Sequence, residues 1–305
     1  MRFGKLDLNL LVTLDALLKE RSVTKAAMRL SLSPSATSNA LARLRDYFQD
    51  ELLVQTGRRM ILTPRAEKLQ VPIHDILLRV ESTVSESTAF DPSSSTRAFR
   101  IIATDYIQMV LAPHLMALIH EIGSPVEINV LPWTSSSKRD LELGEVDFLI
   151  ASKNLLSDAH PFQGLYSERL VCLVWEGSAL AKEPLTYDRF LNARHAKVKA
   201  WSGLEDPIAS WYPRPKGYTE NLAITTYSMA ALSGLIEGTD CVAVLPYLLA
   251  RKLAAIGGGK IMDMPFETPE MELCAQWNNY NQADPGIKWI LGLFDQAVGR
   301  MENNS

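Results

Sequence analysis

The hydrophobic pattern of the chain changes at the run Asp91-Pro92-Ser93-Ser94-Ser95, which is typical of a linker or domain boundary. Before this run, apolar residues recur at helical spacing. After it, short apolar runs alternate with helical stretches, which is the βα order of an open, mostly parallel sheet. A chain of 305 residues can hold two or three domains. We therefore expect a small helical domain followed by an α/β domain long enough to form two lobes.

The first 63 residues are predicted to form three helices and a hairpin. Leucines at helical spacing mark a helix over about residues 7–20, and Ser22 can cap a short second helix. Ser33-Pro34 starts a third helix, because a hydroxyl cap precedes proline at the first helical position. The inner face of this third helix is predicted to be Ala36, Ala40, Leu44 and Phe48. Two strand-like runs around Gly57 predict a hairpin or wing.

The outer face of the third helix is short, polar and free of bulk, as a helix that enters the DNA major groove requires. Asn39 can pair with adenine, and serine hydroxyls can donate or accept at several bases. Neighbouring basic side chains are placed to hold phosphates. The predicted DNA-binding residues are Thr24, Pro34, Ser35, Ser38, Asn39, Arg43, Arg45, Arg58 and Arg59. The alternative is a polar helix face that is simply solvated.

Charge is distributed unevenly along the chain. Residues 1–68 carry 12 basic and 7 acidic side chains, whereas the rest of the chain carries 19 basic and 28 acidic ones. A basic first fifth on an acidic remainder indicates that only the front of the chain meets a polyanion. Chance variation is the alternative explanation.

A second cap and proline, Thr63-Pro64, opens a helix that leads away from the first domain. One stripe of this helix is apolar and is expected to need a cover. Its residues are Leu69, Ile73, Ile76, Leu77, Val80 and Val84. Because the nearby domain is already folded, we expect a second copy of the chain to cover the stripe.

The sequence lacks the motifs that are typical of several other classes of protein. No stretch is long and apolar enough to span a membrane and the N-terminus does not resemble a signal peptide, so we expect a cytoplasmic protein with no membrane partner. The three widely spaced cysteines fit neither a disulfide framework nor a zinc site. Nucleophile elbows, Walker loops and dinucleotide-binding motifs are missing, so we expect no enzyme, no catalytic residue, no metal and no cofactor besides a small-molecule effector.

Several segments together resemble the amino-terminal signature of the LysR-type transcriptional regulators. They are Leu6-Asp7-Leu8-Asn9-Leu10-Leu11, Arg21-Ser22-Val23-Thr24-Lys25-Ala26-Ala27, the run from Leu32 to Leu41, Asp50-Glu51-Leu52-Leu53-Val54-Gln55-Thr56 and Leu62-Thr63-Pro64-Arg65-Ala66. Near the other end, Trp277, Asp284-Pro285-Gly286 and Trp289 resemble the branch that includes the nodulation and naphthalene/salicylate regulators.

The resemblance implies an α/β fold with three parts. A winged helix–turn–helix DNA-binding domain is expected at residues 1–63, a long linker helix that pairs two chains at 64–91, and a periplasmic-binding-protein-like (type 2) effector domain at 92–305. Lobe I of the effector domain is expected at about 97–167 plus 273–305, and lobe II at about 168–272. The resemblance also implies a homotetramer on double-stranded promoter DNA whose bending changes when an effector binds between the lobes. RNA polymerase is an expected partner.

Candidate effector contacts follow the ends of predicted strands, where ligands of open α/β sheets bind. The candidates are Thr104, Asp105, Tyr106, Trp133, Thr134, Glu168, Trp201 and Tyr227. Ordinary packing is the alternative for each of them, and Asp105 is interpreted first as the cap of its helix. Glu168 stands where related aromatic-acid regulators can carry a ligand-contacting histidine, so its acidic side chain argues against a simple aromatic carboxylate as the effector.

A rival hypothesis from another class also fits the pattern. The chain would then be a cytoplasmic small-molecule-binding or catalytic α/β protein whose N-terminal helices serve only for dimerisation. A titration with promoter DNA distinguishes the two hypotheses, because only a regulator binds one sequence tightly and with a steep dependence on salt.

Overall fold

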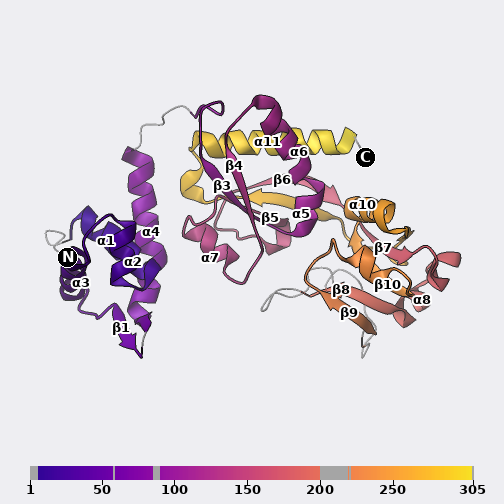
Figure 1. Cartoon of the computed structure of the whole chain (residues 1–305), viewed down its shortest axis with the longest axis horizontal. Coiled ribbons are helices and arrows are strands. Elements are labelled where there is room, and N and C mark those ends of the chain that lie inside the picture. Colours follow the sequence, from indigo (N-terminus) through magenta and orange to yellow (C-terminus); the bar gives the residue numbers. More distant parts are fainter. Residues whose placement is uncertain (1–5, 58, 85–89, 200–218, 220, 304–305) are drawn as a thin grey trace. The chain divides into compact units, whose positions relative to one another are not determined.

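The computed structural model describes residues 6–57, 59–84, 90–199, 219 and 221–303 (Figure 1). The chain divides into two compact units, Met1–Thr88 and Ala89–Ser305, and each unit has a hydrophobic core of its own. Among the helices in these ranges, none is both long enough and apolar enough to cross a bilayer.

The first unit is a three-helix cluster followed by a hairpin and a long helix. Its elements are α1 (Leu8–Glu20), α2 (Val23–Arg29), α3 (Pro34–Phe48), β1 (Leu53–Thr56), β2 (Arg59–Leu62) and α4 (Pro64–Val84). Short polar side chains begin the helices: Asp7 accepts from the N–H of Leu10, Ser22 from that of Lys25, and Ser33 from that of Ala36. β1 and β2 pair antiparallel and form the wing.

The inner face of α3 differs from the predicted one. The buried residues are Thr37, Leu41 and Leu44, while Ala36 is exposed and Ala40 is half-buried. A strict i, i+4 series drifts by about 40° at each step because the helix has 3.6 residues per turn. Over three steps that drift moves the first member of the predicted series off the core, so the core uses the mixed i+4, i+3 spacing instead.

The apolar stripe of α4 is partly covered by its own unit. Ile73 is buried in the core of the first unit, and Leu69 and Leu77 pack against that core. The Gln70 side chain also donates to the carbonyl of Leu18 at 3.1 Å. Ile76, in contrast, is 44% exposed. The expectation that a partner chain covers the whole stripe is therefore wrong for Leu69, Ile73 and Leu77, which pack against the core of their own unit.

The second unit contains two five-stranded sheets. The first sheet has the order β4-β3-β5-β12-β6 and the second the order β11-β7-β10-β8-β9. We call the first sheet with its helices lobe I and the second lobe II. The strands are β3 (Ala98–Ala103), β4 (Glu127–Leu131), β5 (Phe148–Ser152), β6 (Phe162–Glu168), β7 (Leu170–Trp175), β8 (Arg194–Val198), β9 (Leu222–Thr226), β10 (Cys241–Pro246), β11 (Gly259–Asp263) and β12 (Met271–Gln276).

Helices cover both sheets. They are α5 (Asp105–Val110), α6 (Ala112–Ile122), α7 (Ser137–Glu142), α8 (Tyr187–Asn192), α9 (Leu232–Ile236), α10 (Tyr247–Gly257) and α11 (Pro285–Asn303), with single 3₁₀ turns at Lys153–Leu155, Ala179–Lys182 and Asn279–Asn281. Figure 1 shows α6 and α11 side by side along the first sheet, and the two helices are in contact. One hydrophobic core contains residues of both lobes.

Each sheet is mixed, so the prediction of a mostly parallel sheet is wrong. β3 pairs parallel with β4 and β5, and β8 pairs parallel with β9 and β10. The pairs that involve β6, β7, β11 and β12 are antiparallel. The chain passes from one lobe to the other between β6 and β7 and again between β11 and β12. Because these four strands are joined by passages between lobes and not by βαβ crossovers, they need not run parallel to their neighbours.

Several predicted elements also differ in extent. The apolar stretch over residues 106–120 has the pattern of one helix, but it forms two, α5 and α6, with Pro113 at the start of α6. The stretch 228–237, which ends before Gly238 and has the pattern of a helix, is helical only over Leu232–Ile236. Gly257, Gly258 and Gly259 follow one another in the sequence; Gly258 adopts φ +61° and ends α10, and Gly259 begins β11. The lobe boundaries at about 167 and 272 remain predictions; β7 begins at Leu170 and β12 at Met271.

Candidate nucleic-acid interface and ligand site

The outward face of α3 is exposed among the described residues of the first unit. Ser35, Ser38 and Asn39 are exposed, as are Pro34 at the start of the helix and Thr24 on α2. The hydroxyls of Ser33 and Ser35 lie 3.0 Å apart, so the first turn carries a small cluster of hydroxyls beside the N-terminal N–H groups. A short, polar and narrow surface of this kind can approach base edges and phosphates.

The arginines around α3 have different surroundings. Arg43 is exposed and makes a long, solvent-accessible ion pair of 3.5 Å with Asp7. Arg59 is exposed on the wing, and Arg58 lies outside the described residues. Arg45 is different, because its guanidinium donates to the carbonyls of Glu51 and Leu53, each at 2.8 Å. Arg45 thus connects α3 to the wing, and the structure gives it a positioning contact besides the predicted phosphate contact.

The base of the wing is fixed by a carboxylate that sequence reasoning did not single out. Asp50 accepts from the Thr63 hydroxyl at 2.6 Å and from the N–H of Leu52 at 2.7 Å. These hydrogen bonds lower the pKa of Asp50 below its usual value, with the Thr63 hydroxyl as the largest cause. Thr63 also caps α4 by accepting from Ala66. The wing and α4 therefore share one anchoring pair.

In the second unit, several predicted effector residues lie at one edge of the first sheet. β3 and β4 run parallel, with Ile102 beside Leu131, so Thr104 and Trp133 follow the same carboxyl edge. Trp133 is buried and its indole N–H has no hydrogen-bond partner. The Thr134 hydroxyl lies 2.9 Å from that of Ser136. This edge thus presents hydroxyls and one unsatisfied buried donor, which a polar ligand group can meet.

Asp105 connects the two lobes. Its carboxylate accepts from the Ser228 hydroxyl at 2.7 Å and from the N–H of Ala230 at 3.0 Å, and also from its neighbour Tyr106. The N-cap of α5 is Thr104, and Asp105 is the first residue of the helix. Asp105 is therefore not the cap that the sequence suggested. It holds the turn after β9, which explains an acidic side chain at this point. Ser228 was not singled out from the sequence.

A buried chain of hydroxyls ends on Glu168. Tyr166 donates to the Tyr106 hydroxyl at 3.0 Å, and Tyr106 donates to Glu168 at 3.2 Å. Glu168 also accepts from the N–H groups of Arg169 and Leu248. Burial is the largest effect on Glu168 and raises its pKa, although these hydrogen bonds oppose it. Burial likewise raises the pKa of both tyrosines.

Glu168 is therefore occupied by protein groups, and its closest contacts are internal. Tyr166 and Leu248 were not singled out from the sequence, because the chain of hydrogen bonds joins residues that are 60 to 80 positions apart. Of the remaining predicted effector residues, Tyr227 is 59% exposed beside Ser228. Trp201 lies outside the described residues.

One pocket of about 380 Å³ lies between elements of the two lobes. α5 and α6 supply Val110 and His114, α11 supplies Met301, and α10 supplies the rest of the lining: Leu248, Arg251, Lys252 and Ala255. Lys252 donates to the carbonyl of Met109 at 2.9 Å. Burial, with Lys252 and Arg300 nearby, lowers the pKa of His114. Of the predicted effector residues that the structure describes, none lines this pocket.

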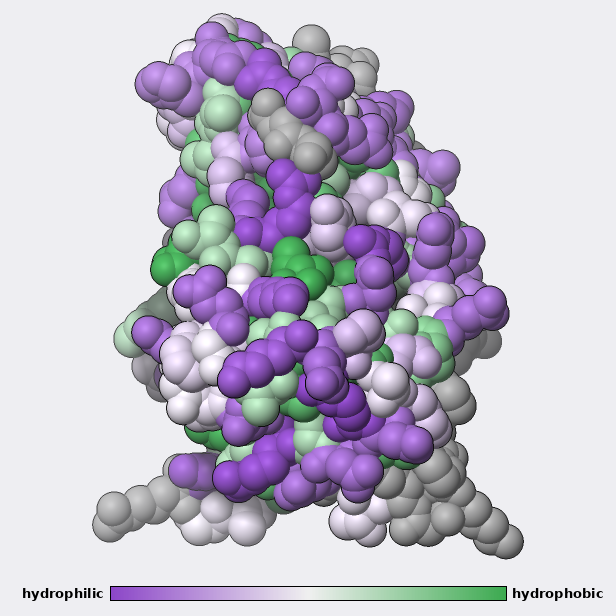
Figure 2. Space-filling view, turned by 90° about the vertical axis from the view of Figure 1, so that its right-hand side faces the viewer, coloured by the Kyte–Doolittle hydropathy of each residue, from purple (hydrophilic) through white to green (hydrophobic). Residues whose placement is uncertain are grey.

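Within the described ranges, no group of three or more His, Cys, Asp or Glu side chains is arranged to hold a metal. The three cysteines are buried and free. Burial raises the pKa of Cys172 strongly and that of Cys274 to about 11, so these two thiols stay protonated near neutral pH. Figure 2 shows a mostly hydrophilic face on which hydrophobic residues are dispersed, as is usual for a solvated surface.

A winged helix–turn–helix with an open, narrow recognition helix, joined to a two-lobed α/β unit, defines a ligand-responsive transcriptional regulator. Two family models match: the bacterial regulatory helix-turn-helix protein, lysR family, over residues 8–67, and the LysR substrate binding domain over residues 93–299. The chain belongs to the LysR family of transcriptional regulators, with a DNA-binding and an effector-binding domain.

Relatives of known sequence match this chain over most of their length. Nodulation protein D 1 of Rhizobium tropici is 34% identical over 301 residues, which cover 99% of this chain and 98% of that protein. Nodulation protein D of Bradyrhizobium sp. (strain ANU 289) is 33% identical, with 99% and 89% covered. The resemblance to the nodulation branch is thereby confirmed.

Solved structures agree in fold. A probable transcriptional regulator of Pseudomonas aeruginosa is 29% identical with a TM-score of 0.63, covering 95% of this chain and 97% of that one. Full-length OxyR of the same organism (a variant) has a TM-score of 0.75 at 15% identity, with 96% and 94% covered. ArgP from Mycobacterium tuberculosis has a TM-score of 0.69 at 16% identity, with 96% and 97% covered.

Proposed function

We propose that this regulator binds one promoter sequence through α3 and the wing, and that a small-molecule effector held between lobes I and II changes how it binds and bends that DNA. The observation that carries the first part is the exposed face of Ser35, Ser38 and Asn39 on α3. Thr24, Pro34, Arg43, Arg58 and Arg59 are proposed as phosphate and groove contacts around it.

The proposed effector response rests on the contact between lobes. Asp105 on α5 accepts two hydrogen bonds from the turn after β9, so lobe I and lobe II have a defined polar connection. A ligand that binds one arrangement of the lobes better than another shifts the population toward it. Thr104, Trp133 and Thr134 at the edge of the first sheet are the proposed contacts of that ligand, because Trp133 carries an unsatisfied buried N–H.

The proposed pairing of two chains rests on helix α4. Ile76 is exposed on the side of the stripe that the first unit leaves uncovered, which supports pairing of two chains through α4. A tetramer, contact with RNA polymerase, a cytoplasmic location and the need for no cofactor besides the effector are parts of the same proposal.

Salt-dependent titration with operator DNA tests the proposal. We expect the logarithm of the binding constant to fall steeply with the logarithm of salt concentration. Ser38→Ala and Asn39→Ala are expected to reduce the preference for operator over unrelated DNA by about 1–3 kcal/mol per lost base contact. Arg59→Ala should weaken all sequences alike and reduce the salt slope by about one.

Asn9→Ala is the matched control, since Asn9 is an exposed asparagine on α1 and is not among the proposed DNA contacts. It should bind operator as the wild type does. A flat salt response, or equal affinity for unrelated DNA, would refute the proposal and favour an α/β ligand-binding protein with a dimerisation module. Effectors are found by screening metabolites for those that raise the melting temperature of the full chain.

A further inference from the structure

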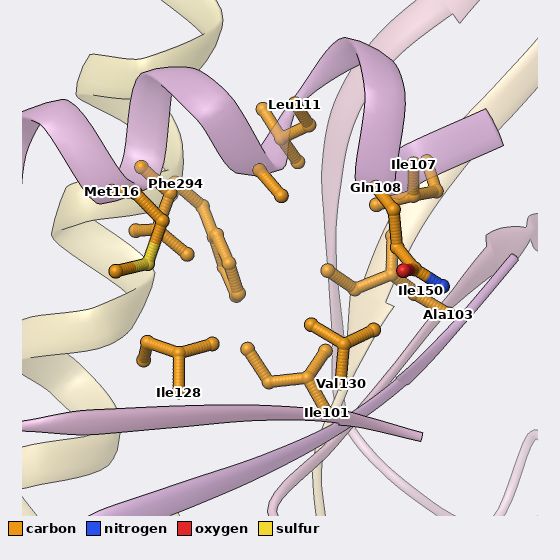
Figure 3. A pocket seen from close by; sticks show the side chains of 12 residues that line it. Ile101, Ala103, Ile107, Gln108, Leu111, Met116, Ile128, Val130, Ile150 and Phe294 are labelled. Carbon is orange, nitrogen blue, oxygen red and sulfur yellow. The ribbon is translucent and has the colours of Figure 1, made fainter. Parts of the chain in front are cut away.

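Lobe I contains an apolar pocket that is separate from the contact between the lobes. Its volume is about 180 Å³, and its lining comes from β3, β4, β5, α5, α6 and α11 (Figure 3). Figure 3 shows Ile101, Ile128 and Val130 projecting from the strands toward Leu111 on the helical side, with Phe294 of α11 beside them. The side chains of these elements surround the space without filling it.

The chemistry of the lining is nearly uniform. All but one of its side chains are apolar, and the exception is the amide of Gln108, which lies at one side of the pocket. Gln108 is exposed and Met116 is 46% exposed, so the pocket communicates with solvent there. An apolar cavity of about 150 Å³ stays dry and takes up benzene. The pocket in lobe I therefore matches a single aromatic ring in size and in polarity.

The pocket touches the helix that connects the lobes. Ile107 and Gln108 line it from α5, and Asp105, which bonds to Ser228 of lobe II, lies less than one turn earlier on the same short helix. A ligand packed against α5 therefore has a direct path to the interlobe contact.

The geometry points to a second ligand site in lobe I, which takes a small monocyclic aromatic molecule bearing one hydrogen-bonding group that faces Gln108. This site goes beyond the proposed interlobe effector, and its lining includes none of the residues proposed for that effector. Occupancy would hold α5 in place and so bias the connection between Asp105 and Ser228.

The test uses p-cresol and toluene as probes of the full chain, with binding followed by ligand-observed NMR titration. The two probes differ by one hydroxyl. We expect one saturable p-cresol site per chain. Val130→Phe fills the pocket and should weaken p-cresol at least about tenfold. Leu131→Phe enlarges the next residue of β4, which packs in a different hydrophobic cluster, and should bind as the wild type does.

Gln108→Leu should leave the fold intact, because residue 108 is exposed. It should reduce the preference for p-cresol over toluene by about threefold to tenfold, as one lost hydrogen bond predicts. Binding that survives Val130→Phe, or that Trp133→Phe abolishes while Val130→Phe does not, would overturn the proposal. So would a change of oligomeric state in Val130→Phe without loss of binding, since the pocket would then be a surface between copies. Operator binding is measured separately, so failure here leaves the proposed function intact.

Discussion

Removing the hydroxyl at the centre of the buried tyrosine chain should cost far more than removing the one at its end. Tyr106 donates to the Glu168 carboxylate and accepts from Tyr166. Tyr106→Phe removes a hydrogen bond to a charged group, worth about 1.5–3 kcal/mol, and leaves the buried Tyr166 hydroxyl without its acceptor, at about 1–3 kcal/mol. Tyr166→Phe removes only one neutral hydrogen bond, at about 0.5–1.5 kcal/mol.

Differential scanning calorimetry of the full chain measures the difference. About 1 kcal/mol corresponds to roughly 2–4 °C for a domain of this size, so Tyr106→Phe should lower the melting temperature of the second unit by at least about 5 °C. Tyr166→Phe should lower it by only about 1–6 °C. The double variant strands no hydroxyl and should be at least as stable as Tyr106→Phe alone. Equal single effects, or a double variant destabilised by the sum of both, would refute this account of the chain.

Three further predictions concern other contacts. Arg45→Ala should destabilise the first unit by about 1–3 kcal/mol in urea unfolding, because two carbonyls lose their donor, while Arg43→Ala should cost about 0–1 kcal/mol. Burial raises the pKa of Glu168 above 4.5 in the folded protein. The stability that its proton confers is therefore present below pH 4.5 and is lost as pH rises through the higher folded pKa. Glu168→Gln should remove this loss of stability when unfolding of the variant and of the wild type is compared from about pH 4 to 8. Ile76→Asp should shift the oligomer toward smaller species in analytical ultracentrifugation without unfolding the first unit, and an unchanged oligomer would contradict pairing through α4.

The sequence was most informative where structure is determined by neighbours in the chain. Ser22, Ser33 and Thr63 predicted where α2, α3 and α4 begin, because each can cap a helix. The 3.6-residue period of the helix predicted the polar outer face of α3. The wing followed from two short apolar runs around a glycine. These features depend on contacts over a few residues, so their pattern is visible without a fold.

Contacts between distant segments could not be predicted in this way. Asp105 and Ser228 are 123 positions apart, and the sequence around each residue does not indicate that the other is its partner. The same holds for Arg45, whose type suggested a phosphate contact although its guanidinium also holds the wing. The strand Phe162–Glu168 could not be recognised from its sequence, because Gly164 and polar residues obscure its alternation.

The order of strands in lobe I determines which lobe can fold first while the chain is being synthesised. β12 lies between β5 and β6, and it is made only after all the strands of lobe II. Lobe II comes from one continuous stretch, whereas lobe I waits for the last 35 residues, including the α11 side chains Ile287 and Phe294 that fill its core. Until then β5 and β6 have unpaired edges that invite aggregation. Premature termination between β11 and β12 should therefore leave lobe II able to fold and lobe I unable to do so.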